Sequence, residues 1–492
     1  MVLSLSVSLT WGKPPAEARR PPPLPKPGAA TIPWPDLPPQ AQAGWSIRDA
    51  LTGEVLEDMR GGQALIPAST LKLFTTWAAL DVLGPERTFP TELHHLGTLE
   101  KDLLKGDLVI KGFGDPGFAS AQLAPEHSAE SIFGEWLRAL QQRGVKRMDA
   151  CVRGDGSYLE LEGPHPASLW EDAGNYYAGT ASGLCFNDNL YALIFSGAAR
   201  GRSMKIKGTL PSQVGIATFI NRVRAGPTQS EDSAFIFGGF PSPVRVVSGS
   251  YPARKNEFAI KGSLPNPPWT CAREFQSYLI AHGIPSQEHP GRACPDSLPG
   301  DATPEIALTP ATLVARHVSA PLKELVRHTN QKSDNNYAAQ FLALLGREAG
   351  QSPDCRGGVA ALYAYLGKRG FDLAEIHLKD GNGLSRSNWI SPSQTSKLLS
   401  HARKQKAFPE FKASLVGSPG SEGKLGRYGP GWGNRLWVKT GTLEGVSAAA
   451  GYLQARSGRL VAFAATANNF DHGDADPQRI FAPLFKAWAD KY

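Results

Sequence analysis

Strand-like segments lie at both ends of this 492-residue chain, and any fold has to bring them together. Near the N-terminus, "GWSIRDALTGEVLEDM" (residues 44–59) alternates as two strands around a turn at "LTGE". Three further strand-like segments, and then an amphipathic helix over 477–488, lie near the C-terminus: "NRLWVKTG" (434–441), "SAAAGYLQA" (447–455) and "RLVAFAATAN" (459–468). Because helical segments separate the two ends, the pattern predicts one α+β domain, an antiparallel sheet flanked by helices and closed by N- and C-terminal pieces.

The stretch from residue 89 to residue 308 has a different character. It contains the β-like runs "GDLVIKG", "SAFIFGGF", "VRVVSGSY" and "EFAIKGSL", and two helical stretches near 131–143 and 270–283. We therefore predict that 89–308 is an inserted region of two smaller β-rich subdomains. Residues 43–88 and 309–492 would then form the main domain.

The first 42 residues read as a segment outside the fold. Eleven prolines fall between Pro14 and Pro39, a composition that favours an extended linker. The first twelve residues, "MVLSLSVSLTWG", resemble the apolar part of a signal peptide but lack basic residues in front of it. We expect a signal remnant followed by a linker. No later stretch approaches the length of a membrane span, so the mature chain is expected to have no transmembrane segment.

Charge and cysteine content exclude several function classes. The net charge of +7 is scattered along the chain without blocks, which favours a solvated basic surface over a nucleic-acid site. The five cysteines form no CxxC, and no HExxH or GxSxG occurs, so neither a metal nor another cofactor is predicted. In an oxidising compartment one pair could form a disulfide, with Cys271 and Cys294 nearest in sequence. The alternative is that the cysteines are small buried hydrophobic residues.

The segment "PASTLKLFTTWAALDVLG" (residues 67–84) places a hydroxyl and an amine in an otherwise apolar helix. Ser69 and Lys72 are three residues apart and share a helix face. Apolar surroundings disfavour the charged amine, so a neutral Lys72 could take the proton of Ser69 and make it a nucleophile. Unpaired N–H groups of the first helical turn could hold an oxyanion. The alternative is a serine at a helix start and a lysine that reaches the surface.

Two more short elements complete a set. "SDN" places Ser333 and Asn335 before an apolar helix, where they either face the same site or simply cap the helix. "KTGT" places Lys439 at a strand end, where a cation suits a substrate carboxylate and Gly441 leaves room for a peptide backbone. An SxxK element followed by SDN and KTG is the motif set of penicillin-binding proteins and class A β-lactamases.

From about residue 44 to its end, the chain resembles class C low-molecular-mass penicillin-binding proteins. These are serine D-alanyl-D-alanine carboxypeptidases and endopeptidases of the S13 type, with a penicillin-binding transpeptidase-like fold. The resemblance includes "GDLVIKGFGDPGF" (106–118), "NYYAGTASGLCFNDN" (175–189) and "DGNGLSRSN" (380–388), and the long insertion between SxxK and SDN. It implies an extracytoplasmic or periplasmic enzyme without a cofactor. Peptidoglycan peptides would be its substrates and β-lactams its acylating inhibitors.

The resemblance also implies roles for residues. Ser69 would be the nucleophile and Lys72 its base, and Ser333 and Asn335 would assist proton transfer and hold the substrate. Lys439 and Thr440 would bind the terminal carboxylate. The backbone N–H groups of Ser69 and Thr442 would form the oxyanion hole.

Selectivity requires contacts further from the scissile bond. Arg386 in "DGNGLSRSN" could pair with a carboxylate on the third stem-peptide residue, and Asp155 in "GDGSY" could hold the amine beside it. The alternative is that Arg386 and Asp155 only stabilise turns or surface contacts.

Two other functions fit part of the pattern. A β-lactamase would use a glutamate for deacylation, and "EDAGN" (171–175) has the right form but precedes SDN instead of following it. A catalytically inactive cell-wall-binding module would not need the SxxK element.

Overall fold

The computed structural model describes residues 37–492 except 150, 162, 164–166, 231, 240–241, 255, 286–307, 418–421, 429–430 and 472–476. The expected signal remnant and most of the expected linker lie outside the described residues, as does Cys294.

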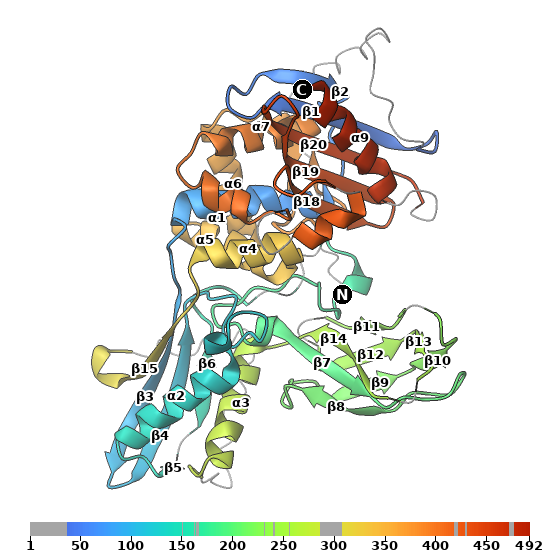
Figure 1. Cartoon of the computed structure of the whole chain (residues 1–492). Helices are drawn as coiled ribbons and strands as arrows, with labels where there is room; N and C mark the ends of the chain where they lie inside the picture. Colours follow the sequence, from blue (N-terminus) through green and yellow to red (C-terminus); the bar gives the residue numbers. More distant parts are fainter. Residues whose placement is uncertain are drawn as a thin grey trace, which may run out of the picture. The chain divides into compact units, whose positions relative to one another are not determined.

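The two ends of the chain meet in one five-stranded antiparallel sheet (Figure 1). Its order is β18-β19-β20-β1-β2, and the strands are β1 (Gln42–Asp49), β2 (Val55–Met59), β18 (Leu436–Leu443), β19 (Val446–Gln454) and β20 (Leu460–Asn468). Strand β1 pairs with β20 over its whole length, with Trp45 opposite Ala465. The α+β domain closed by both ends of the chain is therefore confirmed.

Helices cover both faces of this sheet. On one face Trp45 contacts Trp488 of α9 (Pro477–Lys491), and Phe463 contacts the same tryptophan. On the other face, Ser46 accepts a hydrogen bond from Ser396 of α7 (Pro392–Arg403). Residues 45 and 46 point to opposite faces because side chains alternate along a strand. Many side chains of β19 and β20 are alanines, whose small size lets the helices on both faces pack close to the sheet.

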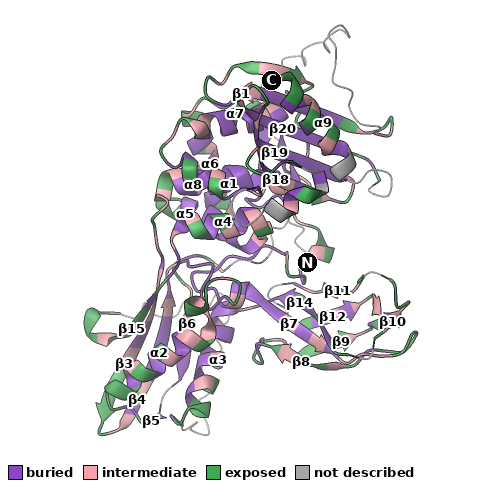
Figure 2. Cartoon of the chain, in the orientation of Figure 1, coloured by how far each residue is buried: buried purple, intermediate pink, exposed green. Residues whose placement is uncertain are grey.

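The remaining helices of the main domain surround one hydrophobic core (Figure 2). Trp77 of α1 is fully buried there and meets Phe411 edge-to-face. The helices are α1 (Lys72–Leu83), α4 (Leu322–Lys332), α5 (Asn335–Glu348), α6 (Cys355–Lys368) and α8 (Phe408–Ala413). Apolar residues lie all around α1, as the sequence suggested, because it is buried on every side.

A second hydrophobic core lies within the region between α1 and α4, around Trp136 and Phe275. One sheet there has the order β15-β3-β4-β5, with β6 also pairing β4; its strands are β3 (Pro90–Glu100), β4 (Leu103–Gly112), β5 (Arg147–Asp149), β6 (Val152–Asp155) and β15 (Leu313–Val318). Helices α2 (Ala129–Gln142) and α3 (Pro267–Ala281) belong to the same core. Strand β15 begins beyond residue 308, so this sheet takes one strand from the range assigned to the main domain. The exact division into domains stays a prediction.

Three smaller sheets complete this region. They are β14 (Phe258–Ser263) with β7 (Leu190–Phe195) and β8 (Ile206–Leu210); β11 (Phe235–Phe237) with β12 (Val244–Ser248) and β9 (Thr218–Asn221); and β10 (Arg224–Gly226) with β13 (Ser250–Pro252). In the main domain, β16 (Ile376–His377) pairs with β17 (Trp389–Ile390). The 3₁₀ turns are η1 (Ala68–Leu71), η2 (Pro125–His127), η3 (Trp170–Asp172), η4 (Asn187–Asn189), η5 (Pro310–Thr312), η6 (Leu373–Glu375) and η7 (Glu422–Tyr428).

The cysteines differ from one sequence expectation. Cys271 is a free thiol buried in α3, so it is not paired with Cys294. Cys151 is disulfide-bonded instead, and its partner lies outside the described residues. Proximity in the sequence did not predict the disulfide, and Cys271 is instead packed in the second hydrophobic core. Among the described residues, none of the helices has both the length and the apolar character that a bilayer span requires.

Candidate active site

Ser69 lies in the 3₁₀ turn η1, not in the α-helix itself, which begins at Lys72. The turn follows Pro67, and Ala68 has φ of +45°, a strained value for a residue with a Cβ. This bend leaves Ser69 half-buried and places Lys72 in the first turn of α1, where its side chain is 0% exposed. The predicted contact follows, with Lys72 Nζ 2.8 Å from Ser69 Oγ.

Lys72 Nζ has two further partners, and both are oxygens that can only accept. It donates to Asn335 Oδ1 at 2.5 Å and to the backbone carbonyl of Asn382 at 2.6 Å. The orientation of the Asn335 amide is fixed, because its Nδ2 donates to the carbonyl of Tyr177 at 2.6 Å. A neutral amine has two N–H donors and one lone pair. With both donors used on carbonyl oxygens, the lone pair is left for the hydroxyl of Ser69.

The surroundings of Lys72 favour this neutral form. Burial lowers the pKa of Lys72 from its ordinary value to about 7, although the charges of Asp380 and Asp334 act in the opposite direction. Asp334 is fixed as the N-cap of α5, where it accepts from the N–H groups of Asn336 and Tyr337. The helix-capping alternative for SDN therefore holds for Asp334. Asn335 in the same motif contacts the lysine.

Ser333 and Lys439 form a second pair beside the first. Ser333 terminates α4 in the left-handed conformation, and its Oγ accepts from Lys439 Nζ at 2.9 Å. Lys439 is buried in β18, and its Nζ also donates to the carbonyl of Thr440. Burial, together with the charges of Lys72 and Lys424, holds the pKa of Lys439 well below its ordinary value. An arriving anion would reverse this effect.

Strand β18 is the edge of the main sheet. Val438 exchanges hydrogen bonds with Val416 on the side away from β19, so the backbone groups of Thr440 and Thr442 face that outer side too. Gly441 passes directly against η1, since a Cβ on it would lie 2.6 Å from the backbone nitrogen of Ser69. No described residue accepts from the N–H of Ser69. This N–H and that of Thr442 are therefore both available beside the Ser69 hydroxyl.

Two contributions were not assigned from the sequence. The carbonyl of Asn382 binds Lys72, and the carbonyl of Tyr177 orients Asn335. A further hydrogen bond joins the 175–189 stretch to α5, since Asn336 Oδ1 accepts from the N–H of Thr180. Both carbonyls lie in stretches that resemble the family, 175–189 and 380–388. Every residue has a backbone carbonyl, so the sequence could not indicate which carbonyls contact Lys72 and Asn335.

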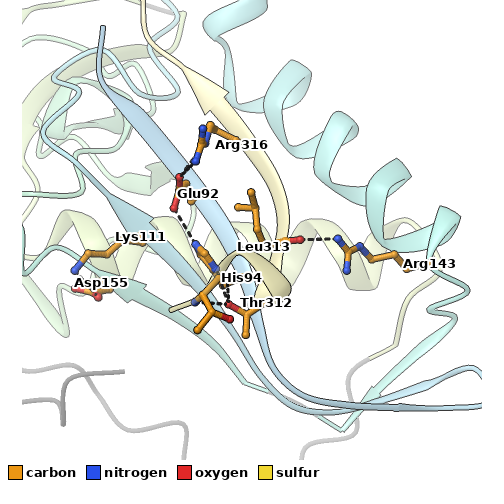
Figure 3. Close-up of polar contacts among 9 residues, drawn as sticks. Glu92, His94, Lys111, Arg143, Asp155, Thr312, Leu313 and Arg316 are labelled. Carbon is orange, nitrogen blue, oxygen red and sulfur yellow. Dashed lines mark hydrogen bonds and ion pairs between the residues drawn. The ribbon is translucent and has the colours of Figure 1, made fainter. Parts of the chain in front are cut away.

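Arg386 and Asp155 are not brought together. Asp155 forms an ion pair with Lys111 of the neighbouring strand at 2.8 Å (Figure 3), and it also accepts a hydrogen bond from the N–H of Ser157. Arg386 donates to the carbonyl of Glu444, and its charge acts on the half-buried carboxyl of Asp172. Burial raises the pKa of Asp172, whereas its hydrogen bond from Tyr177 and the Arg386 charge lower it. The contacts of Asp155 thus support its turn-stabilising alternative, and Asp172 is the carboxylate near Arg386.

No group of three His, Cys, Asp or Glu side chains within the described ranges is arranged to hold a metal ion. A cavity of about 500 Å³ is lined by Phe133, Tyr191 and Tyr278, but by none of the residues around Ser69.

The arrangement places a serine hydroxyl beside a buried lysine whose pKa is lowered, which is what a serine acyl-transfer catalyst with a lysine base would require. The sequence pattern of the D-Ala-D-Ala carboxypeptidase 3 (S13) family matches residues 30–491, so the chain belongs to this family. Membership confirms the enzyme class predicted from the three motifs, a serine-type D-alanyl-D-alanine carboxypeptidase.

Relatives of similar length support this assignment. The D-alanyl-D-alanine carboxypeptidase of Actinomadura sp. (strain R39) is 26% identical over 85% of this chain and 76% of its own length. D-alanyl-D-alanine carboxypeptidase DacB of Haemophilus influenzae is 25% identical over 91% of this chain and 90% of its own. The fold matches the crystal structure of penicillin binding protein 4 (dacB) from H. influenzae with a TM-score of 0.72, at 22% identity over 92% of this chain and 98% of that one.

Gly441→Ala should reduce release of D-alanine from a D-Ala-D-Ala peptide by roughly 10²-fold, about the loss when one oxyanion donor is removed. The added Cβ would collide with the backbone nitrogen of Ser69 and push β18 away from η1. Gly433→Ala is the matched control, because a Cβ there meets nothing within 4 Å. Equal activity of both variants in a D-alanine release assay would contradict the close approach.

Proposed function

We propose that this enzyme removes the terminal D-alanine from peptidoglycan stem peptides through an acyl-enzyme on Ser69, with Lys72 as the general base. The observation that carries the proposal is the set of three partners of Lys72. Two are carbonyl oxygens that take its donors, and the third is the hydroxyl that it would deprotonate.

In the acylation step, Ser69 Oγ forms a bond to the carbonyl carbon of the scissile amide, and its proton moves to Lys72 Nζ. The oxyanion is held by the N–H groups of Ser69 and Thr442 on either side of Gly441. Collapse breaks the C–N bond, and the departing nitrogen takes a proton through the Ser333 hydroxyl. Water then cleaves the ester, with Lys72 again accepting a proton.

The Ser333–Lys439 pair would bind the end of the substrate. A terminal carboxylate beside Lys439 and the Thr440 hydroxyl would favour the charged form of a lysine whose pKa burial lowers. The outward backbone of Thr440 and Thr442 would pair with the extended peptide, as an added strand does at a sheet edge. Cleavage of the D-alanine–diaminopimelate cross-link, an endopeptidase reaction, would use the same groups on a larger leaving group.

β-Lactams would acylate the same serine. The solved H. influenzae relative has been described in complex with a β-lactam. In this chain Glu171, the acidic residue of the ExxxN pattern, is exposed in η3 and forms no hydrogen bond with Ser69 among the described residues. A β-lactam acyl-enzyme should therefore persist.

We further propose an extracytoplasmic location, where peptidoglycan lies. The disulfide at Cys151 supports it, because disulfides form and persist in oxidising compartments. Fractionation of the native host with an antibody against this chain should recover the protein outside the cytoplasmic membrane. Recovery in the cytosol alone, with a reduced Cys151, would contradict the location.

Benzylpenicillin should add one drug mass to the protein, and Ser69→Ala should remain unlabelled. Because only the neutral amine is a base, the acylation rate should rise about tenfold per pH unit below pH 7 and level off above it, as the pKa of Lys72 dictates. Lys72→Ala should lose at least ~10³-fold in rate while retaining its melting temperature within a few degrees. Undiminished acylation of Lys72→Ala, or labelling elsewhere than Ser69, would refute the mechanism.

Arg386 and Asp172 are proposed to recognise the third stem-peptide residue, in place of the predicted Arg386 and Asp155. The guanidinium would bind a side-chain carboxylate and Asp172 the amine beside it. Arg386→Ala should reduce kcat/KM tenfold or more on a peptide whose third side chain ends in an amino-carboxyl centre. Its effect on a peptide ending in a plain amine should be much smaller. Asp155→Asn is the control, and equal losses on both peptides would remove Arg386 from the subsite.

A further inference from the structure

Residues 380–385, which follow β16, form a tight turn built on one buried carboxylate. Asp380 is 3% exposed, yet it has no cationic partner within hydrogen-bond distance among the described residues. Its oxygens accept from the N–H groups of Asn382 at 3.2 Å, Gly383 at 2.7 Å and Ser385 at 2.7 Å, and from Nδ2 of Asn388 at 3.0 Å. Four donors occupy the acceptor positions of an ionised carboxylate, so burial without a counter-charge is compensated.

The turn presents two carbonyl oxygens to one face of α1. The carbonyl of Asn382 accepts from Lys72 Nζ at 2.6 Å, and that of Gly381 accepts from Thr75 Oγ1 at 2.7 Å. Lys72 and Thr75 are three residues apart and share that face. On its other side the turn packs directly against η1 at Gly383, since a Cβ on Gly383 would lie 1.9 Å from the carbonyl oxygen of Ala68. The turn is therefore clamped against both η1 and the start of α1.

We propose that Asp380 is a positioning residue for the reaction: its carboxylate shapes the turn that holds the Asn382 carbonyl on Lys72. The proposal rests on the proposed role of Lys72 as the base. Without the Asn382 carbonyl, one N–H of the neutral amine would have no fixed acceptor, and its lone pair would no longer be directed at Ser69.

The charged groups that face Lys72 come from three elements. Asp380 comes from the turn, Asp334 from the start of α5 and Lys439 from β18. The two carboxylates raise the pKa of Lys72, and Asp380 has the larger effect of the two. Loss of the Asp380 charge should therefore lower the pKa of Lys72 further and extend base catalysis to more acidic pH.

The test is the pH dependence of benzylpenicillin acylation in Asp380→Asn. We expect the acid limb to shift down by roughly 0.5–1 pH unit and the plateau rate to fall tenfold or more. Asp354→Asn is the matched control: Asp354 is also buried, and it caps α6 by accepting from the N–H of Gly357 and from Ser352. It should lose stability without moving the acid limb.

A second variant separates geometry from charge and serves if Asp380→Asn is too unstable to assay. Thr75→Val removes the hydrogen bond to Gly381 but leaves every charge in place. Its plateau rate should fall about threefold or more while the acid limb stays at the wild-type pH. An unshifted limb in Asp380→Asn, or a full rate in Thr75→Val, would overturn the proposal. Acylation of Lys72→Ala would instead overturn the assignment of the base.

Discussion

The burial of one amine is the constraint on which the rest of the site depends. Lys72 is completely enclosed, and an enclosed ammonium is unfavourable unless acceptors surround it. Lys72 Nζ has three such oxygen atoms around it: Ser69 Oγ from η1, Asn335 Oδ1 from α5 and the carbonyl of Asn382 from the turn after β16. A lysine with a pKa near 7 can hold a proton and release it at modest cost, which is what a base used twice per turnover requires.

Such an environment needs segments that are far apart in the sequence. Asn335 is 263 residues from Lys72 and Asn382 is 310 residues away. They are brought together because the N-terminal strands β1 and β2 pair onto the sheet formed by the C-terminal strands β18, β19 and β20, and η1 passes beside β18. The region between α1 and α4 then contributes its own backbone, through Tyr177 and Thr180, to the orientation of α5.

The sequence predicted those parts that are local or that carry a residue signature. The strands at both ends follow from alternation. The three motifs predict Ser69, Lys72, Ser333, Asn335 and Lys439, and these side chains do meet, since Lys72 contacts both Ser69 and Asn335 and Lys439 contacts Ser333. What it missed has a common physical cause. The carbonyl of Asn382 acts through its backbone, which no side-chain pattern reveals. The role of Asp155 in substrate binding stays a prediction, and its carboxylate pairs with Lys111 one strand away. The pairing of Cys271 with Cys294 rested on distance along the chain alone, and Cys271 is a free thiol.

The same reasoning explains why the inserted region contacts the catalytic residues. Under the proposed mechanism, Ser69, Lys439 and the β18 edge would engage the amide and the carboxylate of a D-Ala-D-Ala terminus. Discrimination among stem peptides must then come from groups that the main domain does not supply. Asp172 and Tyr177 lie on a segment that is bound to α5 through Asn335 and to Arg386 through charge. If a peptide binds there as proposed, it would act on the segment that orients Asn335, and recognition of the third residue would then be coupled to the alignment of Lys72.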